Sequence, residues 1–459
     1  MSKITAHEQL SSTAIGLYTK NTLFIRMSSE ADLNPGDGIE PFPGALPAHV
    51  HEFVHYLHNI STTSGIRVIM LTHVMVFMAA QYLIKVGDGV GQSGKSSIQG
   101  DDFKFFIDNI SYLYGDHNDI QDDGRIRSDG WSFSDLKSYR ADCFPEFFSY
   151  KINMFGNFSG VRINKSLRIG FNFITEGVAY EVEREMSREL EQDLIQIERL
   201  TPKFPYLAYE PLVNYLVGRK TTPLERIRIG NAALMHISPS MGFVDACVAL
   251  RKSEYLFDGL FKKYIDGFAD YIKKEFHPML VHLMDFYKNT DRLSKSYKNY
   301  MSLIVETSRK RLANQFLEES FLGQGVNYKN FTKKASSVAE FCIMQEKSNG
   351  SAGLVMHGHS QGLASVPEED TTWFYVLCAA IHFVQLHLTM SGEVMKTAQL
   401  EPKMCLFSGA CQVELNEGNP SVCKTRPWNF ERKVDVDKQG VCWYIAGIKS
   451  ITPEPIVRS

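Results

Sequence analysis

The chain has 459 residues, which is enough for two or three domains with sizeable cores. Hydrophobic residues make up 44% and charged residues 22%, which excludes a wholly disordered protein. The 49 basic and 52 acidic residues nearly cancel, so there is no global positive field to attract nucleic acid, and nucleic-acid binding is not expected.

The beginning of the chain, MSKITAHEQLSS, is polar and lacks the features of a signal peptide. The most apolar stretch, Ile66 to Val86, is broken by polar residues, so it predicts a buried helix rather than a membrane span. Eight cysteines are scattered along the chain without a disulfide-type spacing. We therefore expect a cytoplasmic protein with reduced thiols and no membrane contact.

The first predicted element is a strand at Thr22–Met27, rich in β-branched and aromatic residues. A Pro- and Gly-rich loop over Asn34–Pro47 follows, and Pro47 suits the first turn of a helix that runs to about Ile60. After the apolar helix from Ile66, the Gly-, Ser- and Asp-rich segment Gly87–Asp102 predicts a surface loop.

Beyond this loop the pattern is mainly helical. Apolar periodicity predicts a helix at Phe103–Tyr114, a long amphipathic helix at about Phe173–Leu200, and a helical pair at Leu256–Tyr287 and Leu293–Phe321. A short strand is expected at Val441–Ile445. The fold class predicted is α+β and mainly α-helical.

Three regions are expected along the chain. Residues 1–200 would form a catalytic region with a small sheet, residues 201–335 a helical region, and residues 336–459 a C-terminal helical region that carries cysteines. The helical additions are expected to form the walls of a cleft or to bind a protein partner such as a regulator.

The sequence HEFVH at positions 51 to 55 has the pattern H-E-x-x-H on a predicted helix. His51 and His55 lie one turn apart on the same helical face, so that both imidazoles can bind one metal ion. Glu52 lies beside the first ligand, from where its carboxylate can act as general base toward a water at the metal. The motif predicts a zinc site with catalytic Glu52.

A catalytic zinc site needs a third protein ligand, and the segment TEGVAYEVE at 175 to 183 offers Glu176. With this segment the sequence resembles the gluzincin class of zinc peptidases, in which a Glu on a later helix, often followed by Gly-x-Ala, is the third ligand. Gly177 and Ala179 match that context. The resemblance implies a zincin-like catalytic region, and small residues that let this helix pack closely on the His51–His55 helix.

The resemblance covers only these two segments, and the gap of 176 − 55 = 121 residues is longer than in the simplest gluzincins. Alternative third ligands on the same predicted helix are Glu181, Glu183 and Glu185. A metzincin is excluded, because the positions that would hold its Gly and its third His are occupied by His58 and Ser61.

Other polar residues are candidates for supporting roles. Glu183, seven residues after Glu176, lies on nearly the same helical face and would orient a histidine ligand. Tyr180 and His236 are candidate donors to the oxyanion that forms on an attacked carbonyl. His49, His58 and Asn59 crowd the metal helix and are weaker candidates.

Two further motifs give alternative functions. GVGQSGKS, Gly89 to Ser96, matches a phosphate-binding loop in which Lys95 would contact nucleotide phosphates, but the segment lacks a clear helix directly after it. GHSQG at 358 to 362 matches the elbow of a serine hydrolase at Ser360, but suitable Asp and His residues do not follow.

Four cysteines lie near the C-terminal end of the sequence: Cys405, Cys411, Cys423 and Cys442. Four thiolates could bind a structural zinc ion, but the irregular spacings make buried reduced thiols the simpler interpretation.

The sequence thus predicts a zinc peptidase that hydrolyses peptide bonds of a narrow range of protein substrates, and an endopeptidase rather than an exopeptidase. Zn²⁺ is the expected cofactor, and a protein or peptide the expected partner. The alternatives are a nucleotide-binding switch that uses Lys95, and an interaction scaffold with a catalytically inactive zinc site.

Overall fold

The structure of the protein is a computed structural model. It describes residues 15–22, 24–36, 38–80, 83–86, 90–93, 100–116, 130–141, 144–158, 161–286, 291–323, 325–347, 351–358, 368–387, 395, 397–410, 420–429 and 442–451. Within these residues the fold is α+β and mainly helical, which confirms the predicted fold class.

Helices supply most of the described structure. The α-helices are α1 (Ala45–Ser61), α2 (Thr63–Ala80), α3 (Gly100–Tyr114), α4 (Phe171–Glu189), α5 (Leu194–Leu200), α6 (Tyr206–Val217), α7 (Pro223–Met235), α8 (Pro239–Lys252), α9 (Glu254–Tyr271), α10 (His277–Phe286), α11 (Asp291–Ala313), α12 (Phe331–Val338), α13 (Glu368–His387), α15 (Pro420–Thr425) and α16 (Trp443–Ile451). A π-helical segment, η2 (Ile272–Phe276), joins α9 to α10, and short 3₁₀ turns include η4 (Leu317–Phe321).

The described strands form three small sheets. The strands are β1 (Gly16–Tyr18), β2 (Phe24–Met27), β3 (Leu83–Val86), β4 (Val90–Ser93), β5 (Trp131–Ala141), β6 (Phe144–Phe158), β7 (Val161–Arg168), β8 (Phe341–Glu346) and β9 (Ala352–His357). One sheet has the order β1-β2-β8-β9, a second is the antiparallel sheet β5-β6-β7, and the third is the hairpin β3-β4.

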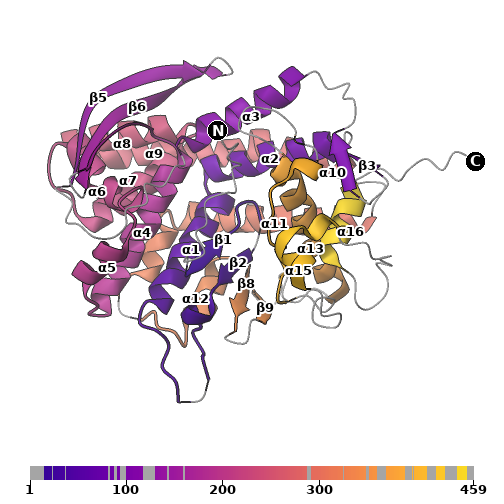
Figure 1. Cartoon of the computed structure of the whole chain (residues 1–459). Coiled ribbons are helices and arrows are strands. Elements are labelled where there is room, and N and C mark those ends of the chain that lie inside the picture. The colour runs from indigo at the N-terminus through magenta and orange to yellow at the C-terminus, as the bar shows by residue number, and fades with distance from the viewer. Residues whose placement is uncertain are drawn as a thin grey trace, which may run out of the picture.

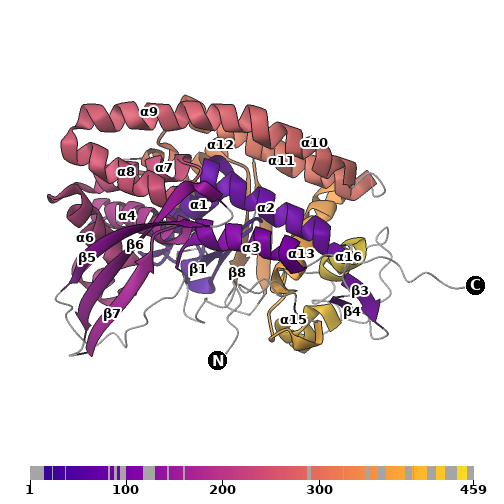
Figure 2. The same cartoon turned by 90° about the horizontal axis from the view of Figure 1, so that it is seen from above.

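Helix α1 lies between α4 on one side and strands β1 and β2 on the other (Figure 1). Seen from above, α9, α10 and α11 line one side, whereas the β5-β6-β7 sheet lies on the opposite side (Figure 2). The buried side chains of α1, α2, α4, α7, α11 and α13 belong to one hydrophobic cluster. The metal motif on α1 is therefore carried by the core of the protein rather than by a loop.

The four-stranded sheet joins segments that are far apart in sequence. Strand β2, which confirms the strand predicted at Thr22–Met27, pairs in parallel with β8, so that Ile25 lies opposite Ile343. Strand β1 pairs with β2 in antiparallel fashion and, among the described strands, has no second neighbour, so it forms the edge of the sheet as described. The predicted first and third regions thus share one sheet.

The predicted long helix Phe173–Leu200 is interrupted. Helix α4 ends at Glu189, and Glu191 has a left-handed φ of 56° that breaks the helical path. Helix α5 then restarts at Leu194, where the Asp193 carboxylate accepts hydrogen bonds from two backbone N–H groups. A carboxylate at such a cap satisfies N–H groups that have no intrahelical partner, and Asp193 is the signal that the sequence prediction missed.

Two other predictions are wrong in part. The predicted loop Gly87–Asp102 contains strand β4, which pairs with β3, and the first turn of α3. The strand predicted at Val441–Ile445 is replaced by helix α16, which begins at Trp443; Val441 itself lies outside the described residues. The Gly-, Ser- and Asp-rich composition of the first segment does not indicate that part of it pairs with β3. In the short apolar run of the second segment, periodicity alone does not separate strand from helix.

A buried ion pair fixes the C-terminal end of α1. Arg311 of α11 donates to both carboxylate oxygens of Glu318 at 2.6 Å, and also donates to Ser61 Oγ at 3.0 Å. The Glu318 carboxylate lies 3.3 Å from His58 Nε2, and all of these side chains are fully buried. A charge that is buried this deeply needs its partner, because its desolvation is otherwise uncompensated.

We expect Glu318→Gln to lower the free energy of unfolding by about 3–5 kcal/mol, because it leaves the Arg311 guanidinium buried without a counter-charge. The matched control is Glu319→Gln, the next residue, whose partner Arg228 is partly exposed and whose ion pair is worth about 0–1 kcal/mol. Urea unfolding of the two variants and the wild type checks the difference. Equal midpoints for both variants would contradict it.

Within the described part of the chain, no helix is both long enough and apolar enough to span a membrane. The apolar helix predicted over Ile66–Val86 is helix α2, which is buried over its first two turns and ends at Ala80, and strand β3 takes the place of its predicted end.

Candidate metal centre

Helix α1 presents His51 and His55 toward α4. The two residues are one turn apart, and their Nε2 atoms lie 3.0 Å from each other, so the rings converge on one point. The opposite face of α1, with Phe53 and Leu57, is fully buried in the core. Core packing on one side and helical spacing on the other therefore hold the two imidazoles in place.

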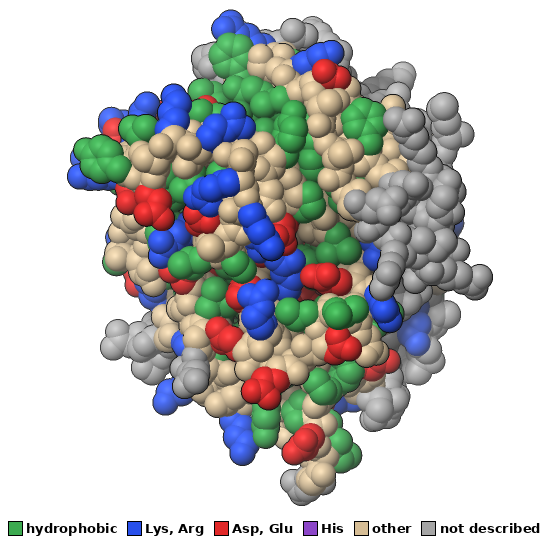
Figure 3. Space-filling model, turned by 90° about the vertical axis from the view of Figure 1, so that its left-hand side faces the viewer, with side chains coloured by type: hydrophobic (Ala, Val, Ile, Leu, Met, Phe, Trp, Pro, Cys, Tyr) green, Lys and Arg blue, Asp and Glu red, His purple; other side chains and the backbone are tan. Residues whose placement is uncertain are grey.

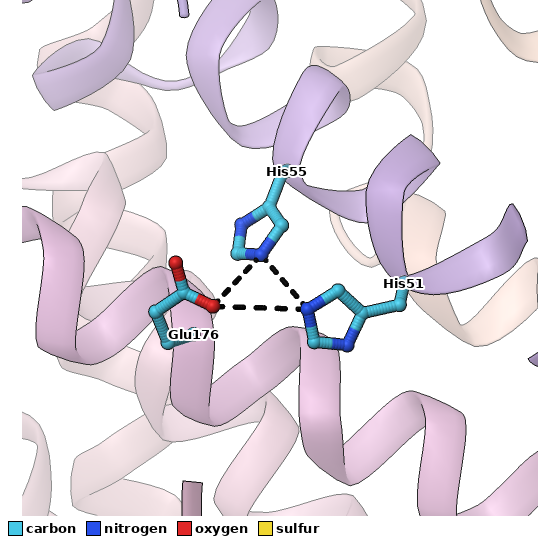
Figure 4. A group of neighbouring side chains, drawn as sticks. All are labelled: His51, His55 and Glu176. Atoms are coloured by element: carbon cyan, nitrogen blue, oxygen red, sulfur yellow. Dashed lines mark hydrogen bonds and ion pairs between the residues drawn. The ribbon is translucent and has the colours of Figure 1, made fainter. Parts of the chain in front are cut away.

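Helix α4 brings Glu176 to the same point (Figure 4). Its Oε2 lies 3.0 Å from His55 Nε2 and 3.7 Å from His51 Nε2. Ligand atoms at about 2.0–2.1 Å from a tetrahedral zinc ion are about 3.3 Å from one another, so these separations fit one ion bound by three ligands. Two imidazoles and a carboxylate are also the donor set that such an ion binds.

Glu183 lies behind His51. Its Oε2 is 2.7 Å from His51 Nδ1, the ring nitrogen that points away from the metal ligand position. When that nitrogen donates its proton to the carboxylate, the other nitrogen, Nε2, is the one left to bind a metal. Glu183 thus lies within hydrogen-bond distance of His51, two turns along α4 from Glu176, which is the position that the predicted orienting role requires.

We expect Glu183→Gln to weaken metal affinity about 10–100-fold without unfolding the protein, because the ring of His51 loses its orienting carboxylate. Zinc affinity measured by competition with a chromogenic chelator checks this. Glu185→Gln, whose carboxylate binds Arg188 at the surface, is the matched control and should leave the affinity unchanged. An unchanged zinc affinity of the Glu183→Gln variant would show that Glu183 does not orient the His51 ring.

The electrostatics of the cluster favour an ionised carboxylate beside a neutral ring. Burial alone would raise the pKa of Glu176, but His55 and His51 beside it hold that pKa well below its usual range. Burial lowers the pKa of His55 to about 4. Burial also opposes charge on His51, yet its hydrogen bonds to Glu176 and Glu183 raise its pKa above the usual range. Glu176 and Glu183 thus stabilise a positive charge at this point, against the cost of its burial.

Glu52 lies next to the cluster, under the edge strand β1. Its Oε2 accepts a hydrogen bond of 2.6 Å from the backbone N–H of Tyr18. Gly16 makes room for this arrangement, because a Cβ at that position would lie 2.7 Å from Glu52 Cγ. Burial raises the pKa of Glu52 to about 7. The backbone contact from Tyr18 could not be seen in the sequence, because it involves no particular side chain.

The cluster opens into a large cavity of ≈1670 Å³, which His51, Glu52, His55 and Glu176 all line. Tyr180 lines the same cavity one turn after Glu176, and burial raises the pKa of its hydroxyl, which therefore keeps its proton and remains a donor. Tyr206, at the start of α6, was not predicted: its ring lies 5.8 Å from that of His51 and 5.6 Å from that of Tyr180. An isolated tyrosine in a helical segment carries no signal of such a role.

His236 does not lie in this cavity. It follows the last residue of α7, its Nδ1 lies 2.9 Å from the Ser238 carbonyl oxygen, and it lines a second cavity with Tyr264. Its prediction as a donor to the oxyanion at the metal site is therefore not supported, because it was chosen by residue type alone and the fold directs it elsewhere.

The three weaker candidates near the motif have structural partners. His49 Nε2 contacts the Ala31 carbonyl oxygen, His58 contacts Glu318, and Asn59 accepts a hydrogen bond from the Tyr18 hydroxyl. Of the alternative third ligands, Glu181 forms ion pairs with Arg184 and Arg226 on the far side of α4.

The predicted role of Gly177 needs a correction. A Cβ at this position would lie 2.1 Å from the ring of Tyr209, so Gly177 lets α6, not the metal helix α1, approach α4 closely. The small residue does serve helix packing, but the sequence pattern does not say which neighbour it faces.

The other sequence motifs remain largely outside the described residues, which omit Lys95, Ser96, Ser360 and Cys411. The preceding part of the phosphate-loop motif, Val90–Ser93, is strand β4, so its backbone groups pair with β3. In the part of the chain that the structure describes, His51, His55 and Glu176 are the one cluster found with metal-ligand geometry.

Comparison with protein-family models, with curated proteins and with solved structures finds no match to this chain.

Proposed function

We propose that the protein is a zinc-dependent peptidase in which His51, His55 and Glu176 hold the metal ion and Glu52 is the general base. The observation that carries the proposal is the convergence of three ligand atoms, 3.0–3.7 Å apart. Glu52 lies directly beside them and is not one of the three ligand residues. Three protein ligands leave one position for water or substrate, which is the pattern of catalytic rather than structural zinc.

A bound zinc ion would supply Lewis acidity, which lowers the pKa of a water molecule and polarises a carbonyl group. Glu52 would take the proton of that water during attack on the carbonyl carbon and pass it to the leaving amine. Its pKa of about 7 suits a group that both accepts and releases a proton near neutral pH. Tyr180 is a candidate donor to the oxyanion, because its protonated hydroxyl lines the same cavity.

A polypeptide substrate is supported by the edge strand. In an antiparallel ladder the N–H and C=O groups of alternate residues point outward. Ile15 bonds to Ser28 and Thr19 bonds to Phe24, so the backbone groups of Gly16 and Tyr18 lie on the outer side, toward Glu52. An extended chain can pair with such an edge through the groups other than the Tyr18 N–H, which donates to Glu52. The cavity is also larger than the about 300–1,000 Å³ of small-molecule sites.

The direct test is incubation of the zinc-loaded protein with a mixture of unrelated peptides and proteins, followed by mass spectrometry of the products. Peptide-bond cleavage that stops on addition of a chelator and returns with zinc supports the proposal, and internal cleavage sites identify an endopeptidase. Absence of any cleavage, with zinc bound in stoichiometric amount, favours the inactive scaffold instead.

A further inference from the structure

The β5-β6-β7 sheet carries an unusual row of positive charges. Lys137 of β5 lies directly opposite Lys151 of β6, which lies directly opposite Arg168 of β7. Like charges in directly opposed cross-strand positions destabilise a sheet. We call these three residues the cation row. A sheet that keeps such a row has a reason to do so other than its own stability.

The cation row lies on the solvent face of this sheet. The opposite face is buried through Trp131, Ile152, Met154 and Leu167, whereas Lys137 and Lys151 are exposed. Figure 3 shows the left-hand side of the molecule as drawn in Figure 1, where Lys and Arg side chains are interspersed with Asp and Glu side chains. The neighbours on the solvent face are largely Ser and Asn, which add hydrogen-bonding groups without charge.

Negative charge near the row is limited. Asp116 binds Arg168 at 2.8 Å, and Asp135 accepts a hydrogen bond from Asn153. Lys151 lies over the ring of Tyr139 at 4.5 Å from its centre. Among the described residues, neither Lys137 nor Lys151 forms an ion pair. Two of the three cations are thus exposed to a ligand in solution.

The row leads to the candidate metal centre. Arg168 lines the same cavity as Glu176, and helix α4 begins three residues after it. Within the cavity, Lys20 donates a hydrogen bond to Asn172, which is one turn before Glu176 on α4, and lies 4.9 Å from the centre of the Tyr114 ring. Basic side chains therefore occur from the outer strand β5 to within about one helical turn of the metal ligands, and of these Arg168 is paired with Asp116.

We infer that the cation row binds an acidic segment of a polypeptide and directs it into the cavity of His51, His55 and Glu176. The inference rests on the proposed peptidase function and names its substrate class, a chain with Asp or Glu residues beside the scissile bond. Nucleic-acid binding typically neutralises about 6–10 phosphates, and anionic membranes attract clusters of about 4–8 basic residues. Three cations in a row suit a shorter acidic peptide better.

The test measures binding separately from cleavage. A fluorescein-labelled oligo-glutamate peptide is titrated with the full chain carrying Glu52→Gln, so that it is not hydrolysed, at about 0.15 M salt. In this background Lys137→Gln/Lys151→Gln removes two charges of the row. The matched control, Lys262→Gln/Lys329→Gln, removes two exposed lysines elsewhere, one of which also stacks on a tyrosine.

We expect the row variant to weaken binding of the acidic peptide roughly tenfold and the control variant less than about twofold, as the sum of two exposed charge contacts. With Glu52 restored, kcat/KM for acidic peptides should fall by the same factor in the row variant while that for neutral peptides stays unchanged. A merely structural role of the lysines would change both.

Equal binding by the row and control variants would overturn the inference. So would tighter binding of single-stranded DNA, or of phosphatidylcholine–phosphatidylserine vesicles, that is lost in the row variant, since the row would then serve another class of partner. Cleavage of neutral peptides without preference for acidic ones would support the peptidase proposal and contradict the role of the cation row in binding acidic substrates. Binding of the acidic peptide that depends on the cation row, without any cleavage, would support the role of the row and contradict the peptidase proposal.

Discussion

Glu52→Gln is expected to abolish most of the peptidase activity while the protein keeps its metal. The amide cannot accept a proton from water, so the contribution of general-base catalysis, about 10²–10⁴-fold in kcat/KM, is lost. The substitution is nearly isosteric, and Glu52 is not one of the three ligand residues, so zinc content should stay at about one ion per chain. Cleavage kinetics and metal analysis on the same preparations check both halves of the expectation.

Glu185→Gln is the control for this experiment. It removes a carboxylate from α4 that binds Arg188 at the surface and does not line the cavity, so activity should remain. Full activity of the Glu52→Gln protein would show that Glu52 is not the general base. A Glu52→Gln protein that has lost its zinc would instead mean that this residue is a ligand.

The second large effect concerns Glu176. Replacing it by Gln removes the charged ligand that closes the cluster, and we expect zinc to be lost in dialysis that wild type withstands. Because zinc binds the folded state, its loss also lowers stability, by about 2.7 kcal/mol where free zinc is 100 times its Kd for the wild type. Zinc should therefore raise the Tm of the wild type clearly and that of Glu176→Gln little.

Metal analysis and thermal unfolding with and without a chelator test this expectation. Glu185→Gln serves again as the control and should behave as the wild type does. Should Glu176→Gln bind zinc as tightly as the wild type, a different third ligand holds the metal and the proposed centre is wrong. Should neither protein bind zinc or any other divalent ion, the cluster is an ion pair between two histidines and a carboxylate.

Local spacing made part of the centre predictable. His51 and His55 are four residues apart on a helix, and this spacing alone places both rings on one face wherever the helix packs. Glu183 follows Glu176 by seven residues, so its place on the same face of α4 was also foreseen. That the two helices meet was suggested by a resemblance to gluzincins, and the distances between His55 and Glu176 agree with it.

Other contacts depend on how distant segments assemble. The hydrogen bond from Tyr18 to Glu52 needs β1 at the edge of a sheet whose third strand comes from residues 341–346. The position of His236 in a second cavity follows from the end of α7 and its bond to Ser238. Neither follows from periodicity, because each results from the direction in which a packed element points its side chain.

Residue spacing was thus sufficient for the mainly helical class, for the paired histidines and for placing Glu183 on the face of Glu176, since these depend on interactions within a few turns of one helix, whereas the choice of Glu176 came from the resemblance to gluzincins. The edge strand above Glu52, and the contacts of the Arg311–Glu318 pair with Ser61 and His58 of α1, exist because chain segments of high sequence separation meet in the fold. Such meetings are decided by burial of the common core, which no single segment of the sequence encodes.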